Sequence, residues 1–169
     1  VYKRQEDGIP PQGWCGYPLT YKETIFHKIV PHETIHGGDV VSARSGKTAG
    51  QYGESIYGPR MYDEQAPYDP LTDASFKMIM ATDPGRKNSA SSQFIFTLGP
   101  MPHLAQSVKV IGTIIKGADW LETIASTASL TNSGQPLVHV PRGSQGLHSA
   151  GRLSLGMTHL CANPHHWYM

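Results

Sequence analysis

The sequence has few of the features that mark secreted, membrane-spanning or nucleic-acid-binding proteins. Its 2 cysteines, Cys15 and Cys161, lie near opposite ends and give neither a disulfide framework nor a CxxC metal motif. No apolar run approaches the roughly 20 residues that a membrane-spanning helix needs. The charge is nearly balanced, with 14 Lys and Arg against 13 Asp and Glu, so nothing predicts a nucleic-acid partner. Scarce cysteine favours a reducing intracellular compartment and leaves a mitochondrial or chloroplast location open.

A length of 169 residues predicts one domain with a core of ordinary size. We expect an N-terminal loop over 1–13, a folded domain over 14–148 and a C-terminal extension over 149–169. The sequence starts at Val1, without an initiating Met or a signal-like apolar segment. We therefore expect a processed or N-terminally truncated chain, from which any targeting signal is gone.

Apolar periodicity predicts short strands joined by long loops. Strands are expected over 24–30, 75–82, 92–99, 108–115 and 136–142. Gly112 predicts a bulge or bend in the fourth of these strands. A helix is expected over 117–129, because Trp120, Leu121 and Ile124 fall on one face. The Gly- and Ser-rich segment 37–58 reads as irregular loop. This pattern predicts a mainly β barrel or sandwich that carries a helix.

Four motifs occur in a fixed order along the chain. They are FHKIVPHETIHGGD (26–39), GESIYG (53–58), SSQFIFTLGPMPHL (91–104) and VIGTIIKGADWLETI (110–124). Together they resemble the cyclophilins, the cyclosporin-binding family of peptidyl-prolyl isomerases, over about residues 14–147. The resemblance implies an antiparallel eight-stranded β-barrel with capping helices and a peptide groove on its outer face.

The resemblance also implies that the front of the domain is missing. Family members begin with a β-hairpin and a helix, but only 25 residues precede Phe26 here, and they read as loop. A barrel without that hairpin has unpaired strand edges, which are templates for other chains. We therefore expect either an incomplete sequence or a neighbouring chain that fills the gap.

A prolyl isomerase needs few chemical groups. Rotation about an X-Pro bond faces a barrier of roughly 18–20 kcal/mol. A catalyst must favour the twisted amide with an apolar pocket for the proline ring and a rigid cationic donor near the prolyl nitrogen. No nucleophile, metal or cofactor is required, so we expect no cofactor.

Carried over residue by residue, the groove of the family is degenerate in this chain. Lys28 stands at the position of the catalytic arginine and lacks the planar fork of a guanidinium. His36 and Gln93 stand at two glutamine positions, so Lys28, His36 and Gln93 form the expected, degenerate catalytic set. The remaining groove positions correspond to Glu33, Thr34, Ala81, Thr82, Asp83, Ile95, His103, Leu104 and Val108.

Several of these residues also have simpler interpretations. Lys28 can be a solvated surface lysine, and Gln93 a buried amide that satisfies backbone groups. An unpaired Glu33 would be costly to bury, so we expect it to lie close to Lys28. A metal site at His27 and its neighbours is not expected, because strand alternation puts His27 on the opposite face from Lys28. Cys161 with His165 and His166 is a weak second candidate.

The sequence therefore predicts a cyclophilin-type domain with lost or weak isomerase activity, which serves as an accessory or scaffolding part of a larger assembly. Its expected partners are other protein subunits, with proline-containing peptides as a second class; no nucleic acid and no membrane span are expected. One alternative is an active peptidyl-prolyl isomerase that tolerates Lys28. Another is a non-catalytic module that grips extended peptide through Gln93 and residues 81–83.

Overall fold

The computed structural model describes residues 12–21, 24–45, 48, 50–63, 69–73, 76–128, 131 and 134. Its elements are the strands β1 (Lys28–Val30), β2 (Thr34–Gly37), β3 (Lys77–Met80), β4 (Phe94–Thr97) and β5 (Val110–Thr113), the helices α2 (Ser42–Ser45) and α3 (Ala118–Thr127), and the 3₁₀ helix η1 (Pro102–Leu104). None of the helices in these ranges is long and apolar enough to cross a membrane.

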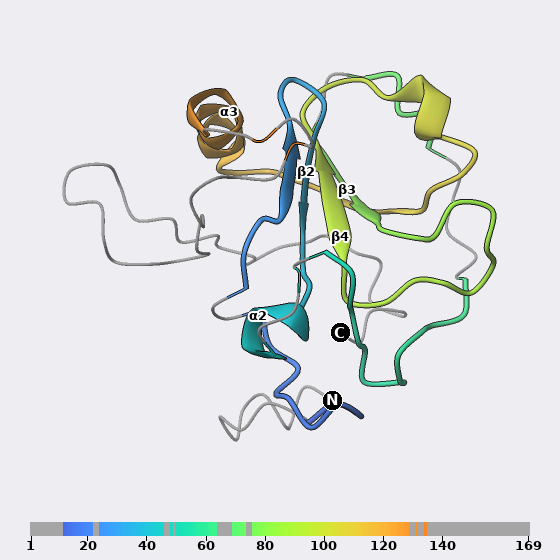
Figure 1. Ribbon diagram of the computed structural model, residues 1–169. Coiled ribbons are helices and arrows are strands. Elements are labelled where there is room, and N and C mark those ends of the chain that lie inside the picture. Colours follow the sequence, from blue (N-terminus) through green and yellow to red (C-terminus); the bar gives the residue numbers. More distant parts are fainter. Residues whose placement is uncertain are drawn as a thin grey trace.

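The strands form one antiparallel sheet in the order β1-β2-β4-β3-β5, with α3 beside the β1–β2 hairpin and α2 at its far end (Figure 1). Lys28 lies opposite His36, and His36 lies opposite Ile95 on the next strand. Directly paired residues point to the same face, so these three side chains form a row. Ile29, Ile35 and Phe96 form the neighbouring row on the opposite face.

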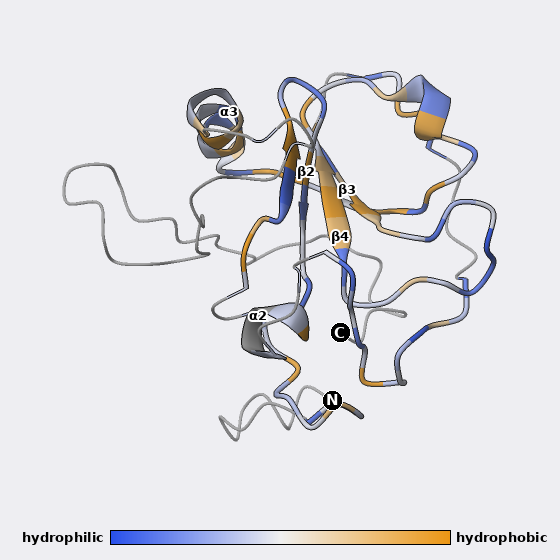
Figure 2. Ribbon diagram, viewed as in Figure 1, coloured by the Kyte–Doolittle hydropathy of each residue, from blue (hydrophilic) through white to orange (hydrophobic). Residues whose placement is uncertain are grey.

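The face that carries Ile29, Ile35 and Phe96 is the core of the molecule, and we call it the core face. These residues are buried together with Met78, Met80, Phe94, Leu121 and Ala125. The rings of Phe94 and Phe96 lie 4.9 Å apart, and α3 contributes Leu121 and Ala125. Figure 2 shows the consequence, since β3 and β4 are largely hydrophobic whereas β1 and β2 are mixed.

A smaller apolar cluster lies beside η1. Its buried members are Leu71, Met101 and Ala105, and Leu104, Val108 and Val110 pack against them. The backbone ties the cluster together, because the Met101 N–H donates to the Leu71 carbonyl at 2.7 Å.

The mainly β, antiparallel class with a covering helix is confirmed; the described residues form five strands in one sheet. Four of the expected strands and the expected helix are present, each with narrower bounds. The bulge is confirmed too, because Met78 pairs with Gly112 while Ile79 pairs with Val110. The expected strand over 136–142 and the extension over 149–169 lie outside the described residues.

Two elements differ from the expectation. Thr34–Gly37 is a strand, although its polar residues gave no strand period, and Ser42–Ser45 is a short helix inside the expected loop. Alternation also misplaces Phe26, which it puts on the face of Lys28. The regular strand begins at Lys28, and Phe26 packs in the core against Phe96, with ring centroids 6.2 Å apart.

Candidate functional site

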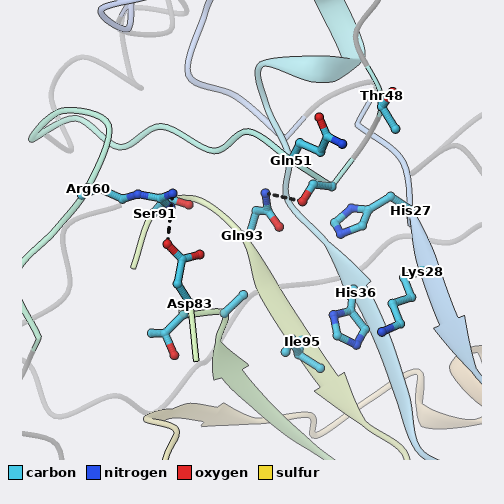
Figure 3. A pocket seen from close by; sticks show the side chains of 13 residues that line it. His27, Lys28, His36, Thr48, Gln51, Arg60, Asp83, Ser91, Gln93 and Ile95 are labelled. Atoms are coloured by element: carbon cyan, nitrogen blue, oxygen red, sulfur yellow. Dashed lines mark hydrogen bonds and ion pairs between the residues drawn. The ribbon is translucent and has the colours of Figure 1, made fainter. Parts of the chain in front are cut away.

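The row of Lys28, His36 and Ile95 opens onto a cavity of about 440 Å³, so we call this side of the sheet the cavity face (Figure 3). The cavity is lined from three directions, by strands β1, β2 and β4, by the segment after β3, and by loops of the 48–60 region. Its other lining residues are His27, Thr48, Gly50, Gln51, Arg60, Ala81, Thr82, Asp83, Ser91 and Gln93.

Both His27 and Lys28 line this cavity, which corrects the expectation that they face opposite ways. Strand alternation does not reach His27, because β1 begins at Lys28. The His27 N–H donates to the His36 carbonyl at 3.1 Å, and the two imidazole rings lie 6.3 Å apart. The hairpin thus brings two imidazoles and one amine together.

Both imidazoles are neutral near neutral pH. Burial, together with the smaller effects of Lys28 and His27, lowers the pKa of His36 to about 4. Burial also lowers the pKa of His27, although Asp39 opposes the shift and Lys28 supports it. The Nε2 atom of His36 is hydrogen-bonded to the Thr34 hydroxyl at 3.1 Å. The Nδ1 atom of His27 is buried and has no hydrogen-bond partner among the described residues.

A buried carboxylate, Asp39, anchors the loop around Gly50 that forms one wall of the cavity. We call this loop the loop wall. One of its oxygens accepts hydrogen bonds from the Gly50 N–H at 2.8 Å and the Tyr52 N–H at 3.0 Å. The carboxylate also caps α2, because the Ser42 N–H and hydroxyl donate to it at 2.8 and 2.6 Å. Gly50 has φ 92°, and a Cβ there would lie 2.5 Å from Cδ2 of His27. This wall was not found from the sequence.

Gln93 joins the same wall to the sheet. Its amide nitrogen donates to the Gly50 carbonyl at 3.3 Å. This contact fits the simpler interpretation of Gln93 as an amide that satisfies backbone groups, while its position still lines the cavity.

The wall of the cavity that Arg60 and Asp83 form carries an ion pair. Arg60 Nη2 lies 3.3 Å from Asp83 Oδ2, and Arg60 Nη1 donates to the Ser89 carbonyl at 3.1 Å. Arg86 reaches the same Asp83 oxygen at 3.8 Å. These exposed pairs stabilise the fold little, but they compensate the charges of Arg60 and Asp83. Within the described residues, Lys28 is the lining cation that has no ion pair.

The expected contact between Lys28 and Glu33 is not formed as an ion pair in this part of the chain. Glu33 is exposed in the turn that closes the β1–β2 hairpin, where its N–H donates to the Val30 carbonyl at 3.0 Å. Lys28 is at the other end of β1, opposite His36. Thr34, which is 6 % exposed, pairs with Val30 and contacts His36.

The remaining expected groove residues divide into two groups. The cavity collects Lys28, His36, Ala81, Thr82, Asp83, Gln93 and Ile95. The other three lie at the second apolar cluster and do not line the cavity: His103 is exposed on η1, and Leu104 and Val108 pack against Met101 and its neighbours.

Metal ligation is not a feature of the described ranges, where no group of three His, Cys, Asp or Glu side chains could hold a metal ion. Cys161, His165 and His166, the weak candidates near the C-terminus, lie outside those ranges.

Residues 6–141 match the model of the family described as cyclophilin-type peptidyl-prolyl cis-trans isomerase. A curated relative, peptidyl-prolyl cis-trans isomerase D of Mycosarcoma maydis, is 37 % identical over 120 residues, which are 66 % of this chain and 27 % of the relative. A human protein named probable inactive peptidyl-prolyl cis-trans isomerase-like 6 is 31 % identical over 133 residues, 72 % of this chain and 39 % of the relative. The chain thus spans well under half the length of these relatives.

Solved structures are similar over most of the chain. A cyclophilin-type isomerase of Cryptosporidium parvum, crystallised in the presence of the dipeptide Ala-Pro, matches with a TM-score of 0.62 and 30 % identity. The match covers 72 % of each chain. A second crystal structure of the same protein gives a TM-score of 0.60.

Proposed function

Because the chain belongs to the cyclophilin family of peptidyl-prolyl cis-trans isomerases, we propose that its domain has lost or weak isomerase activity and serves as an accessory or scaffolding part of a larger protein assembly. The observation that carries this proposal is the cavity-face row, in which an amine, a neutral imidazole and an aliphatic side chain stand side by side. The human relative, whose name describes it as probably inactive, supports lost or weak activity.

The cation of this row is poorly suited to stabilise a twisted amide. Lys28 is exposed and makes no ion pair with the described residues, so no charged partner there fixes the end of its four-carbon side chain. Holding it against a prolyl nitrogen costs roughly 2 kcal/mol of rotamer entropy. A lysine amine also lacks the pre-organised fork with which a guanidinium can hold an amide in two ways.

The apolar half of a proline site is also thin. Among the lining residues, Ile95 and Ala81 are the ones with purely hydrocarbon side chains. Burial of a proline ring gains about 25 cal/mol per Å² of apolar surface, and this gain falls when histidine, glutamine and charged groups form most of the wall. Weak ground-state binding and weak transition-state stabilisation follow together.

The proposal is tested by a protease-coupled isomerase assay on a proline tetrapeptide, run beside an active cyclophilin. We expect a kcat/KM at least about a hundredfold below that of the active enzyme, because one well-placed electrostatic donor contributes on that order. A comparable kcat/KM would overturn the loss of activity. Cross-linking of the chain in its source cells tests the accessory role, and a chain that stays uncross-linked and monomeric in native extract contradicts it.

A peptide-binding module is the second candidate, favoured by one observation. Residues 81–83 continue β3 along the cavity without regular secondary structure, beside Gln93 on the neighbouring strand. Such a segment can hold an extended peptide backbone by strand-like hydrogen bonds. Binding without catalysis, measured with an unreactive proline peptide, separates this candidate from a working isomerase.

A further inference from the structure

The cavity contains an unbalanced charge. Of its lining cations, Arg60 is paired with Asp83 at 3.3 Å, whereas no carboxylate of the described residues pairs with Lys28. Asp39 is the nearby acid that influences His27, but its oxygens already accept five hydrogen bonds from Val41, Ser42, Gly50 and Tyr52. The charged side chains that line the cavity therefore sum to one positive charge.

The groups around Lys28 include side chains that can donate hydrogen bonds. Each neutral imidazole carries one N–H, and His27 and His36 supply two imidazoles on the same side of the cavity. The Nδ1 atom of His27 is buried and has no partner in the part of the chain that the structure describes, so the other ring nitrogen is the one that can face a ligand. Thr48 adds a hydroxyl to the lining. A hydrogen-bond acceptor that enters the cavity can therefore contact the Lys28 amine and neutral N–H and O–H groups.

We propose that the cavity binds the carboxylate of an acidic side chain in an extended peptide, with Lys28 as its ion-pair partner and His36 beside it. A single uncompensated amine matches the single charge of a carboxylate. A phosphate carries nearly two charges and is typically bound by clusters of arginine, whereas Arg60, the arginine of this cavity, is already paired with Asp83. A volume of about 440 Å³ accommodates one acidic side chain and part of its backbone.

The inference rests on the proposed function, because a groove that still selected proline would use Lys28 for the prolyl amide. It specifies the ligand class of the peptide-binding candidate. The backbone of the peptide would follow residues 81–83, and its acidic side chain would point across β4 toward β1. Ile95, which pairs with His36 of the hairpin, would contact the methylene groups of that side chain.

The test compares three blocked pentapeptides, acetyl-Ala-Ala-X-Ala-Ala-amide with Glu, Gln or phosphoserine as X, titrated into the full chain. Histidine ring signals of His36 and the side-chain amide of Gln93 are followed by NMR. We expect the Glu peptide to bind at least about fivefold more tightly than the Gln peptide, with both signals shifting. The preference should shrink between low and high salt, because mobile ions screen a partly exposed pair.

Three variants test whether Lys28 causes the preference for the Glu peptide. Lys28→Gln should abolish the preference for Glu over Gln, Lys28→Arg should retain it, and Lys116→Gln, an exposed lysine outside the cavity, should leave it unchanged. Equal binding of the Glu and Gln peptides, tighter binding of the phosphoserine peptide, or a preference that survives in Lys28→Gln overturns the inference. The isomerase assay fails or succeeds separately: an inactive chain without acid selectivity refutes this inference alone, and an active chain refutes the proposed function.

Discussion

The two faces of the sheet differ in burial and in the type of side chain that they carry. Successive residues of the same strands alternate between them, so Ile29 and Ile35 are fully buried while Lys28 is exposed and His36 is half-buried. The core face must fill space against α3, and any loss of volume there leaves a cavity. The cavity face borders solvent over β1 and β2, where a polar side chain costs little. An apolar core and a largely polar cavity are therefore compatible within the same few residues.

The largest expected effect comes from a mutation on the core face. Phe94 is 1 % exposed and packs against Tyr21 and Phe96, so Phe94→Ala should lower the free energy of unfolding by about 3–5 kcal/mol. The adjacent Ile95→Ala removes a side chain of the cavity face and should cost clearly less. Urea denaturation of both variants measures the difference. Equal losses would mean that the two faces are packed alike.

Acid should act on the cavity face. The pKa of His36 in the folded state is about 4, below the 6.5 of the unfolded chain. Between these values the unfolded state binds more protons, so this contribution is complete above about pH 6.5 and is lost as pH falls to about 4. His36→Gln should remove roughly 2–3 kcal/mol of the decline in unfolding free energy over this window.

The control for the acid prediction is His103→Gln, which changes an exposed histidine on η1 that does not line the cavity. Its unfolding free energy should depend on pH as that of the parent does. If His36→Gln also leaves the pH dependence unchanged, the imidazole of His36 is not shielded from water as described.

The loop wall gives a smaller effect. Gly50 has φ 92° and touches His27, whereas Gly85 has φ 73° in open space. Gly85→Ala should cost about 1 kcal/mol from the left-handed backbone alone. Gly50→Ala adds the clash with the imidazole and should cost about 1–2 kcal/mol more than Gly85→Ala. Thermal unfolding of the pair measures this difference, and equal values would argue that the wall yields freely around His27.

The smallest expected effect is on catalysis. Lys28→Arg restores the guanidinium but none of the missing apolar surface, so kcat/KM in the isomerase assay should rise by less than about tenfold. A rise to the level of an active cyclophilin would locate the whole defect in one side chain. Circular dichroism of the variant should match that of the parent, because Lys28 is exposed.

Sequence reasoning reached the fold because the core face has a readable period. Met78 and Met80, Phe94 and Phe96, and the stripe on α3 alternate or repeat as buried elements do. It missed β2, because a strand such as Thr34–Gly37 takes its pairing from both neighbours rather than from its own residues. The helix Ser42–Ser45 was missed for a similar reason, since it depends on the cap that Asp39 supplies.

The candidate site was reached only in part. Lys28, His36, Gln93, Ile95 and residues 81–83 line one cavity, as the family resemblance implies for a groove. Gly50, Thr48 and Arg60 come from loops whose path depends on distant hydrogen bonds, such as that from Gln93 to the Gly50 carbonyl. The spacing of apolar residues along the sequence does not predict such long-range contacts. His27 was misplaced because alternation was extended past the first residue of the strand.

The hydrogen bonds of Asp39 have a further consequence for motion. One carboxylate gathers the amides of Gly50 and Tyr52 across 11 and 13 residues of chain, while the sheet beneath is held by its own ladder. Because both amides share one acceptor, we expect Gly50 and Tyr52 to lose these hydrogen bonds together while the strands keep their own ladder. Amide hydrogen exchange at Gly50 and Tyr52 should then proceed at one common rate, faster than at Ile35 and Phe96.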